Sequence, residues 1–216
     1  MRGALLVDVE PAAGPDRLAV LRTVRAAFGE PQDIAGSLAG HLLVLYRVRA
    51  ERVGDAEPDL PERCAALVAD IAERHGLTAR VGVGAVATSV AGLRDSYEDA
   101  ATALRLGALV AEGPVQSIED VRLHQLLTAV GHRARARFAD ALTRELRSQP
   151  DWPVLRQTTV AWCESGFNLV RAAAALHIHR NTLIYRLEKI SRLAGRDTRE
   201  PRACLALYLA CLADQI

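Results

Sequence analysis

The sequence is poor in cysteine and in long apolar segments. Four cysteines occur in 216 residues, and no two of them form a C-x-x-C pair, so we expect neither a metal site nor another cofactor. Apolar stretches are short and interrupted by charges, which excludes a segment that spans a bilayer. The first ten residues are apolar only up to Asp8, which indicates a strand rather than a secretory signal. Scattered thiols fit a reducing compartment, so we expect a cytoplasmic protein with no membrane partner.

Positive charge is scarce in the N-terminal part of the chain. Residues 1–130 carry 13 Lys and Arg against 18 Asp and Glu, whereas residues 131–216 carry 14 against 8. A basic half joined to an acidic half suggests that only the C-terminal part meets a polyanion. Taken alone, however, the charge pattern favours the simpler interpretation of an Arg-rich solvated surface.

Strand and helix patterns alternate over the first 119 residues, which predicts an α/β (α+β) domain around a sheet of four or five strands. The strands are expected at residues 4–9, 34–37, 41–48, 80–87 and 115–118, and the helices at 15–28, 61–75 and 90–110. A hairpin turn is expected near Ala39-Gly40. Gly82 and Gly84 fall inside a strand, so they predict close backbone packing rather than a phosphate loop.

From residue 120 onward only helical patterns occur, so an all-α domain is expected to follow. The predicted helices cover residues 120–129, 132–148, 154–164, 168–176, 180–193 and 201–214. Pro150 and Pro153 mark a break between them. The predicted organisation is therefore a first domain over residues 1–120, a helical connector over 121–149 and a C-terminal domain over 150–216.

Residues 168–195 have the features of a helix-turn-helix. Asn168 is a good N-cap for a short helix that contains the run Ala172–Ala175, whose small side chains allow a second helix to cross closely. Leu176 and Ile178 bracket a tight turn and are expected to point into a shared core. The second helix begins near Arg180 and ends at Gly195, a suitable C-cap. His177 and His179 are interpreted as turn residues rather than as metal ligands.

The second helix separates an apolar stripe from a polar face. At about 100° per residue, Leu183, Leu187 and Ile190 fall on one side. The opposite face carries amide, hydroxyl, phenol and cationic groups, which suit base edges and phosphates. Lys189, the only lysine in the chain, lies on this face, and Glu188 at its margin is the only acid there. The residues predicted to bind double-stranded DNA are Arg180, Asn181, Thr182, Tyr185, Arg186, Lys189 and Arg192.

The segment from His179 to Leu187, with Arg180-Asn181-Thr182-Leu183 and Tyr185-Arg186-Leu187, resembles the H-R-N-T-L-x-Y-R-L pattern of PucR/CdaR-type bacterial transcriptional regulators. Ile184 departs from that pattern, because the family usually has Arg there. The segment VGVGAVATSVAGLRDSYEDAATAL is similar to the degenerate GGDEF-like domain of the same regulators. The resemblance implies a DNA-binding regulator, and since family members usually carry a further N-terminal sensor domain, it implies a short member or a fragment.

A GGDEF-like fold raises the alternative of a nucleotide cyclase. Asp8 and Glu10 stand on the first strand, but the hairpin reads Ala39-Gly40-His41-Leu42-Leu43 where the active motif is Gly-Gly-Asp-Glu-Phe. Because the second metal carboxylate and the catalytic acid are missing, we predict no enzyme activity. A module that binds proteins or a small ligand without binding DNA remains the other alternative. A DNA-binding chain of this kind is expected to act as a homodimer, and a small-molecule effector is compatible with it.

Overall fold

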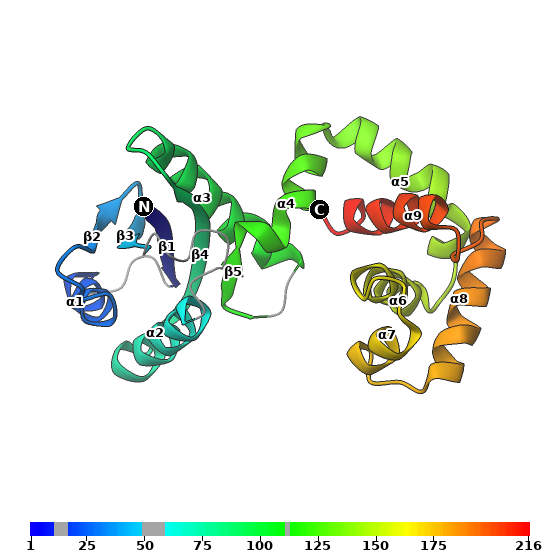
Figure 1. The fold of residues 1–216 in the computed structure, drawn as a ribbon, viewed down its shortest axis with the longest axis horizontal. Helices are drawn as coiled ribbons and strands as arrows, with labels where there is room; N and C mark the ends of the chain where they lie inside the picture. The colour runs from blue at the N-terminus through cyan, green and yellow to red at the C-terminus, as the bar shows by residue number, and fades with distance from the viewer. Residues whose placement is uncertain (11–16, 49–58, 111–112) are drawn as a thin grey trace. The chain divides into compact units, whose positions relative to one another are not determined.

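The computed structural model describes residues 1–10, 17–48, 59–110 and 113–216 (Figure 1). These residues form two compact units, Met1–Arg122 and Leu123–Ile216. The first unit is built on a sheet and the second consists of helices, as the sequence predicts for an α/β part followed by an all-α part. No helix in the described ranges is long and apolar enough to cross a membrane.

The first unit contains a five-stranded sheet within its described residues. The strands are β1 (Arg2–Glu10), β2 (Ile34–Leu38), β3 (His41–Arg47), β4 (Thr78–Ala87) and β5 (Val115–Ser117). Their order is β2-β3-β1-β4-β5; β1 runs antiparallel to both of its neighbours, and β4 and β5 are parallel. The predicted hairpin joins β2 to β3, and both residues of its turn, Ala39 and Gly40, have positive φ.

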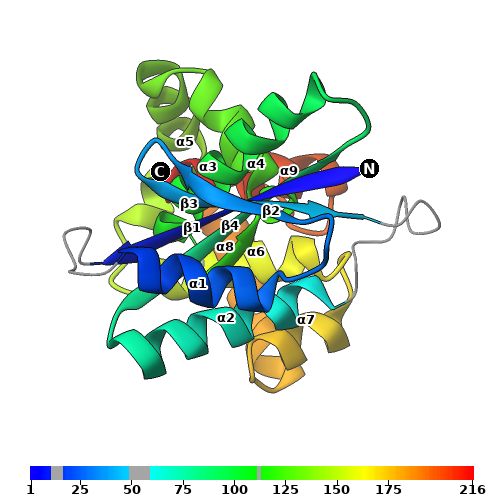
Figure 2. The same ribbon diagram turned by 90° about the vertical axis from the view of Figure 1, so that its left-hand side faces the viewer.

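Helices cover both faces of this sheet (Figure 2). α1 (Arg17–Ala27) and α2 (Leu60–His75) pack on one face, where they form a core with alternate residues of β1. α3 (Gly92–Val110) packs on the other face, against β1 and β4. α2 ends at Gly76, which has a φ of 64° and donates a hydrogen bond from its amide to the carbonyl oxygen of Ala72, so Gly76 is the C-cap. Residues 15 and 16 of the first predicted helix lie outside the described residues.

Gly82 and Gly84 are packing residues, as predicted. A Cβ atom at Gly82 would lie 2.2 Å from the carbonyl oxygen of Ala100, and one at Gly84 would lie 1.9 Å from that of Ser96. The hydroxyl of Ser96 also accepts a 2.8 Å hydrogen bond from the amide of Ala4 in β1. The two glycines therefore let the backbone of α3 approach β4 more closely than any other residue would allow.

The second unit is made of the C-terminal part of α4 and the helices that follow it. The helices are α4 (Ile118–Ala129), α5 (His132–Arg147), α6 (Trp152–Glu164), α7 (Leu169–Ala175), α8 (Arg180–Ala194) and α9 (Pro201–Ala213). Each boundary lies within two residues of its predicted position. Trp162 is buried in the core of this unit with residues from α5, α7, α8 and α9.

α5 belongs to this core, whereas the sequence analysis treats residues 121–149 as a connector. Leu146 of α5 is fully buried beside residues of α6 and α8. Asp214, after α9, accepts hydrogen bonds from Trp152 and Arg156 of α6 at 3.1 and 3.0 Å and pairs with Arg147 of α5. The proline break at Pro150 thus separates two helices of one packed unit, because the apolar and ionic contacts that join them are distant in sequence.

Candidate nucleic-acid interface

The N-terminus of α7 is capped as the sequence predicts. The side-chain oxygen of Asn168 accepts hydrogen bonds of 3.0 Å from the amides of Val170 and Arg171. These bonds satisfy two of the amides that a helix start leaves without a partner. The cap therefore fixes where the first helix of the motif begins.

The turn between α7 and α8 is compact. Ala172 and Ala173 are buried at the helix crossing, and Leu176 and Ile178 pack against the same core. His177 has a φ of 52°, and the Nδ1 of His179 accepts a 3.3 Å hydrogen bond from the amide of Asn181 at the start of α8. Both histidines therefore serve the turn; among the described residues no group of His, Cys, Asp and Glu could hold a metal ion.

α8 presents two opposite faces. Leu183, Leu187 and Ile190 are buried in the core of the second unit, as the helical wheel predicts. The other face is exposed, and 66% of the Tyr185 surface is open to solvent. The exposed predicted residues are Arg180, Asn181, Thr182, Tyr185 and Arg192. The buried stripe holds α8 in place, and the opposite, exposed face forms a polar surface. A single exposed helix of this kind has the width that fits a DNA major groove.

Lys189 and Arg186, the other two predicted residues of α8, are only partly exposed. The ammonium of Lys189 lies 2.8 Å from both carboxylate oxygens of Asp151, at the start of α6, and its side chain is only 20% exposed. The hydrogen bond from Lys189 lowers the pKa of Asp151, and the positive charge of the half-buried Arg186 acts in the same direction. Lys189 is thus engaged in a contact between two helices, which sequence analysis did not predict.

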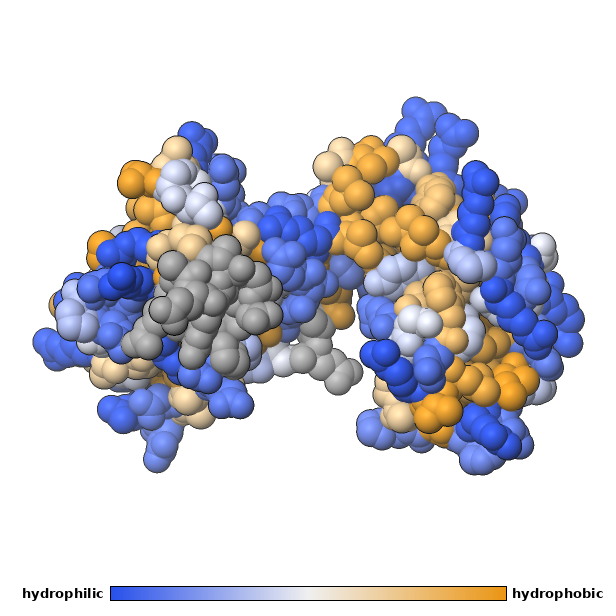
Figure 3. All heavy atoms as spheres, viewed as in Figure 1, coloured by the Kyte–Doolittle hydropathy of each residue, from blue (hydrophilic) through white to orange (hydrophobic). Residues whose placement is uncertain are grey.

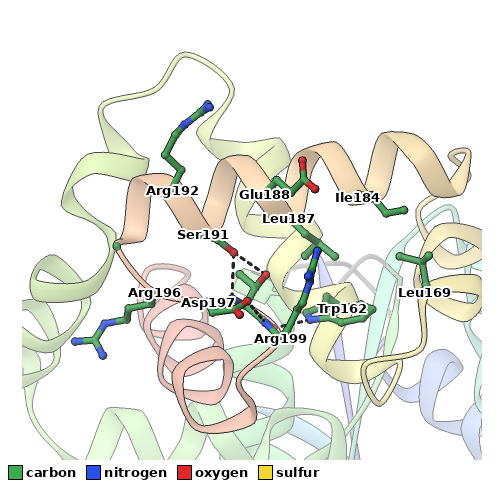
Figure 4. A pocket seen from close by; sticks show the side chains of 12 residues that line it. Trp162, Leu169, Ile184, Leu187, Glu188, Ser191, Arg192, Arg196, Asp197 and Arg199 are labelled. Atoms are coloured by element: carbon green, nitrogen blue, oxygen red, sulfur yellow. Dashed lines mark hydrogen bonds between the residues drawn. The ribbon is translucent and has the colours of Figure 1, made fainter.

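A groove runs along the side of α8 next to the open face (Figure 4). Trp162, Ile184 and Leu187 supply apolar walls, and the loop that follows α8 closes one side. The loop is folded back by Thr198, whose carbonyl accepts a 3.1 Å bond from the Trp162 ring nitrogen and whose hydroxyl lies 2.9 Å from that of Ser191. Ile184, the departure from the family pattern, therefore contributes to this wall.

Two arginines of this loop were missed by sequence analysis. Arg196 and Arg199 are exposed and line the groove together with Arg192. In Figure 4, Arg192 and Arg196 point away from the groove, whereas Arg199 extends along it towards α8. The signal was present in the sequence as a cluster of arginines just after the helix, which extends the basic surface beyond its C-terminus.

The hairpin of the first unit lacks the carboxylates of an active cyclase. The Nδ1 of His41 lies 3.5 Å from a carboxylate oxygen of Asp8, so a histidine faces the acid that would hold a metal. Leu42, in the position of the motif's acidic residue, is 1% exposed and belongs to the core. Asp8 is therefore a partner of His41 on the surface rather than a simple solvated acid.

Comparison with known proteins agrees with this architecture. The PucR C-terminal helix-turn-helix domain matches residues 155–213, and a GGDEF-like domain matches residues 2–106. The chain thus combines a GGDEF-like domain with a helix-turn-helix of the PucR class. These are the two domains of PucR/CdaR-type regulators.

The chain is also similar in sequence to three curated proteins that are named as regulators. The carbohydrate diacid regulator of Escherichia coli is 32% identical over 74% of this chain. The transcriptional activator PmfR of Paenarthrobacter nicotinovorans is 32% identical over 63% of it, and the purine catabolism regulatory protein of Bacillus subtilis is 26% identical over 62%. The matched segments span 42%, 28% and 25% of those proteins, so this chain corresponds to less than half of each relative.

Proposed function

We propose that this chain is a sequence-specific DNA-binding transcriptional regulator that reads the major groove with α8. The observation that carries the proposal is the open polar face of α8, which contrasts with its buried stripe of Leu183, Leu187 and Ile190. The relatives named as transcriptional regulators support the same function.

The proposal divides the face of α8 by position. Arg180 and Asn181, with Thr182 beside them, lie in the first turn, where recognition helices meet base edges. An arginine can donate to both acceptors of guanine, and an asparagine can pair with adenine. Tyr185, one turn further on, is placed to pack on a thymine methyl group.

Phosphate contacts are assigned to the end of α8 and to the loop after it. Arg192, Arg196 and Arg199 are all exposed there, and they extend the basic surface past the last turn of the helix. Arg186 is half-buried and is assigned a phosphate contact at the edge of the face. Lys189 is assigned a positioning role, because Asp151 already holds its ammonium.

The functional form is proposed to be a homodimer, since one helix-turn-helix covers little DNA and two half-sites supply the missing affinity. α4 and α5 carry an apolar surface within the second unit, visible in Figure 3. The exposed fractions are 39% for Leu123, 62% for Leu126, 53% for Val130 and 38% for Phe138. Leu123, Leu126 and Val130 recur at helical spacing on one face, so we assign this surface, termed the α4–α5 apolar surface, to contact with a second copy.

The GGDEF-like unit is proposed to transmit or sense rather than to catalyse. The buried Leu42 stands where the active motif has Glu, and Asp8, one of two acids on the first strand, faces His41. Incubation with GTP or ATP and Mg²⁺ should therefore give no cyclic product. A small-molecule effector would act through this unit, and a regulator of this kind works in the compartment that holds the chromosome, the cytoplasm.

A binding titration tests the function. Genomic binding-site mapping of the intact chain yields an operator, and the protein is then titrated against that operator and a scrambled duplex at two salt concentrations. Arg180→Ala should lose about 1–3 kcal/mol on the operator and relax base preference at one position. Arg192→Ala should weaken binding to both duplexes alike and reduce the salt dependence.

Arg137→Ala is the matched control, because Arg137 is an exposed arginine of α5 that has no place in the proposed interface. It should bind like the parent protein. If folded Arg180→Ala and Arg192→Ala also bind like the parent, α8 does not read DNA. If the parent shows no salt-sensitive affinity for any duplex, the chain is an interaction module instead.

A further inference from the structure

Two cysteines that are distant in sequence meet inside the second unit. The sulfur of Cys163, on α6, lies 3.2 Å from the sulfur of Cys204, on α9, although 41 positions separate them. The Cys163 sulfur also lies 3.8 Å from the carbonyl oxygen of Cys204. Both cysteines are free thiols. A disulfide bond requires ~2.05 Å between sulfurs, so about 1 Å of approach would join the two helices.

The two sulfurs differ in access and in acidity. Cys163 is partly exposed, whereas Cys204 is fully buried. A hydrogen bond from the Cys163 thiol lowers the pKa of Cys204. The same bond, together with burial, raises the pKa of Cys163. Cys163 is therefore the sulfur that an oxidant in solvent can reach, and it reacts through the small fraction that has lost its proton. Cys204, behind it, is the better nucleophile for a second step.

We propose that Cys163 and Cys204 form a reversible dithiol–disulfide site that hydrogen peroxide closes and a thiol reductant opens. In the first step the Cys163 sulfur attacks one peroxide oxygen; the O–O bond breaks, and hydroxide leaves with the thiol proton as water. Cys163 is then a sulfenic acid. In the second step the Cys204 sulfur attacks the Cys163 sulfur, the S–O bond breaks, and a second water leaves with the Cys204 proton. The two thiols are oxidised, and one peroxide becomes two waters.

The other cysteines are placed so that they do not compete. Cys64 lies alone in the core of the first unit, where burial raises its pKa to about 12. Cys211 is on the same helix as Cys204, seven positions away, which is ~10 Å along the axis. Burial raises the pKa of Cys211 to about 12 as well. The chain thus provides two internal controls for selectivity.

Closing the bond would tie α6 to α9 across the core that supports α8. Trp162, the neighbour of Cys163, packs in the same core as Leu183 and Leu187 of α8. A cross-link between helices far apart in sequence restricts the unfolded chain and so favours the folded state. The inference concerns these thiols alone and does not depend on DNA binding.

The test is peroxide treatment of the folded, reduced chain, followed by mass mapping without a reducing agent. The expected product has lost two hydrogen atoms and carries one internal bond between the peptides of Cys163 and Cys204. Dithiothreitol should restore the thiols, and the oxidised protein should melt at a higher temperature than the reduced protein. Cys64→Ser and Cys211→Ser should still form the bond, whereas Cys163→Ser and Cys204→Ser should not.

Several results would overturn the proposal. One is that the thiols stay unchanged after peroxide treatment, and another is that an internal disulfide still forms in Cys163→Ser. A disulfide between two copies of the chain in place of the internal one, or sulfinic acid at Cys163 without any disulfide, would also contradict it. Because the parent protein supplies the mapped bond, the conclusion does not require that the serine variants fold.

Discussion

Lys189 of α8 places its ammonium 2.8 Å from both carboxylate oxygens of Asp151, which precedes α6. This contact joins the proposed recognition helix to another helix of its unit. It also changes the role of the only lysine in the chain, which the sequence predicts to bind DNA. We expect the contact to set the position of α8 rather than to bind DNA.

The Lys189–Asp151 contact predicts a pH dependence of stability. The pKa of Asp151 is lowered from its usual 3.8 by the hydrogen bond from Lys189. Because the folded-state pKa is depressed, the contact stabilises the fold fully above the usual value and is lost as pH falls through the folded value. Lys189→Met should bring the pKa of Asp151 back up, as followed by NMR titration of its carboxyl carbon. An unchanged titration in Lys189→Met would show that the lysine does not hold this carboxylate.

The core of the second unit predicts which fragment folds. Residues 123–216 should form a stable helical unit, since they include the buried Leu146 of α5 and its partners. Residues 150–216 lack α5 and leave Asp214 without Arg147. This shorter fragment, which matches the predicted C-terminal domain, should have a lower midpoint of thermal unfolding by circular dichroism. Equal midpoints for the two fragments would support residue 150 as the domain boundary.

The α4–α5 apolar surface predicts the oligomeric state. Leu126→Asp should shift the chain from dimer to monomer in analytical ultracentrifugation, because a charge would replace an apolar side chain at the proposed contact. Leu205→Asp is the control, since Leu205 is 52% exposed on α9 and lies outside this surface. A parent protein that is monomeric at every concentration tested, or a dimer in Leu126→Asp, contradicts the assignment.

The close contact of α3 with β4 predicts that adding a methyl group at Gly84 destabilises the first unit. Gly84→Ala would place a Cβ atom 1.9 Å from the carbonyl oxygen of Ser96 and should destabilise the first unit by about 1–3 kcal/mol. Gly36→Ala is the matched control, because Gly36 also lies in a strand but has no atom within 4 Å of a Cβ. Urea unfolding of both variants would measure the difference. Similar loss in the two variants would mean that strand propensity, not the helix contact, governs the effect.

Local signals account for the part of the fold that was predictable. Asn168 and Gly195 mark the two ends of the helix-turn-helix, because each residue has a capping preference that acts within one turn. The buried stripe of α8 followed from periodicity alone.

Long-range contacts account for the part that was not predictable. Asp151 and Lys189 are 38 positions apart, and the wheel placed Lys189 on the polar face without any sign of a partner on another helix. The packing of α5 in the second unit likewise depends on residues near the end of the chain, such as Asp214. Neither contact leaves a periodic pattern in the sequence, so both became visible only in the structure.

The two faces of α8 have a consequence for how such a protein can change over generations. The residues that hold the helix in place, Leu183, Leu187 and Ile190, are separate from the exposed residues proposed to read bases, such as Arg180 and Asn181. Exposed helix positions tolerate substitution at little cost in stability. A new operator preference can therefore be acquired by replacing a few outward side chains, while the scaffold that presents them is inherited unchanged.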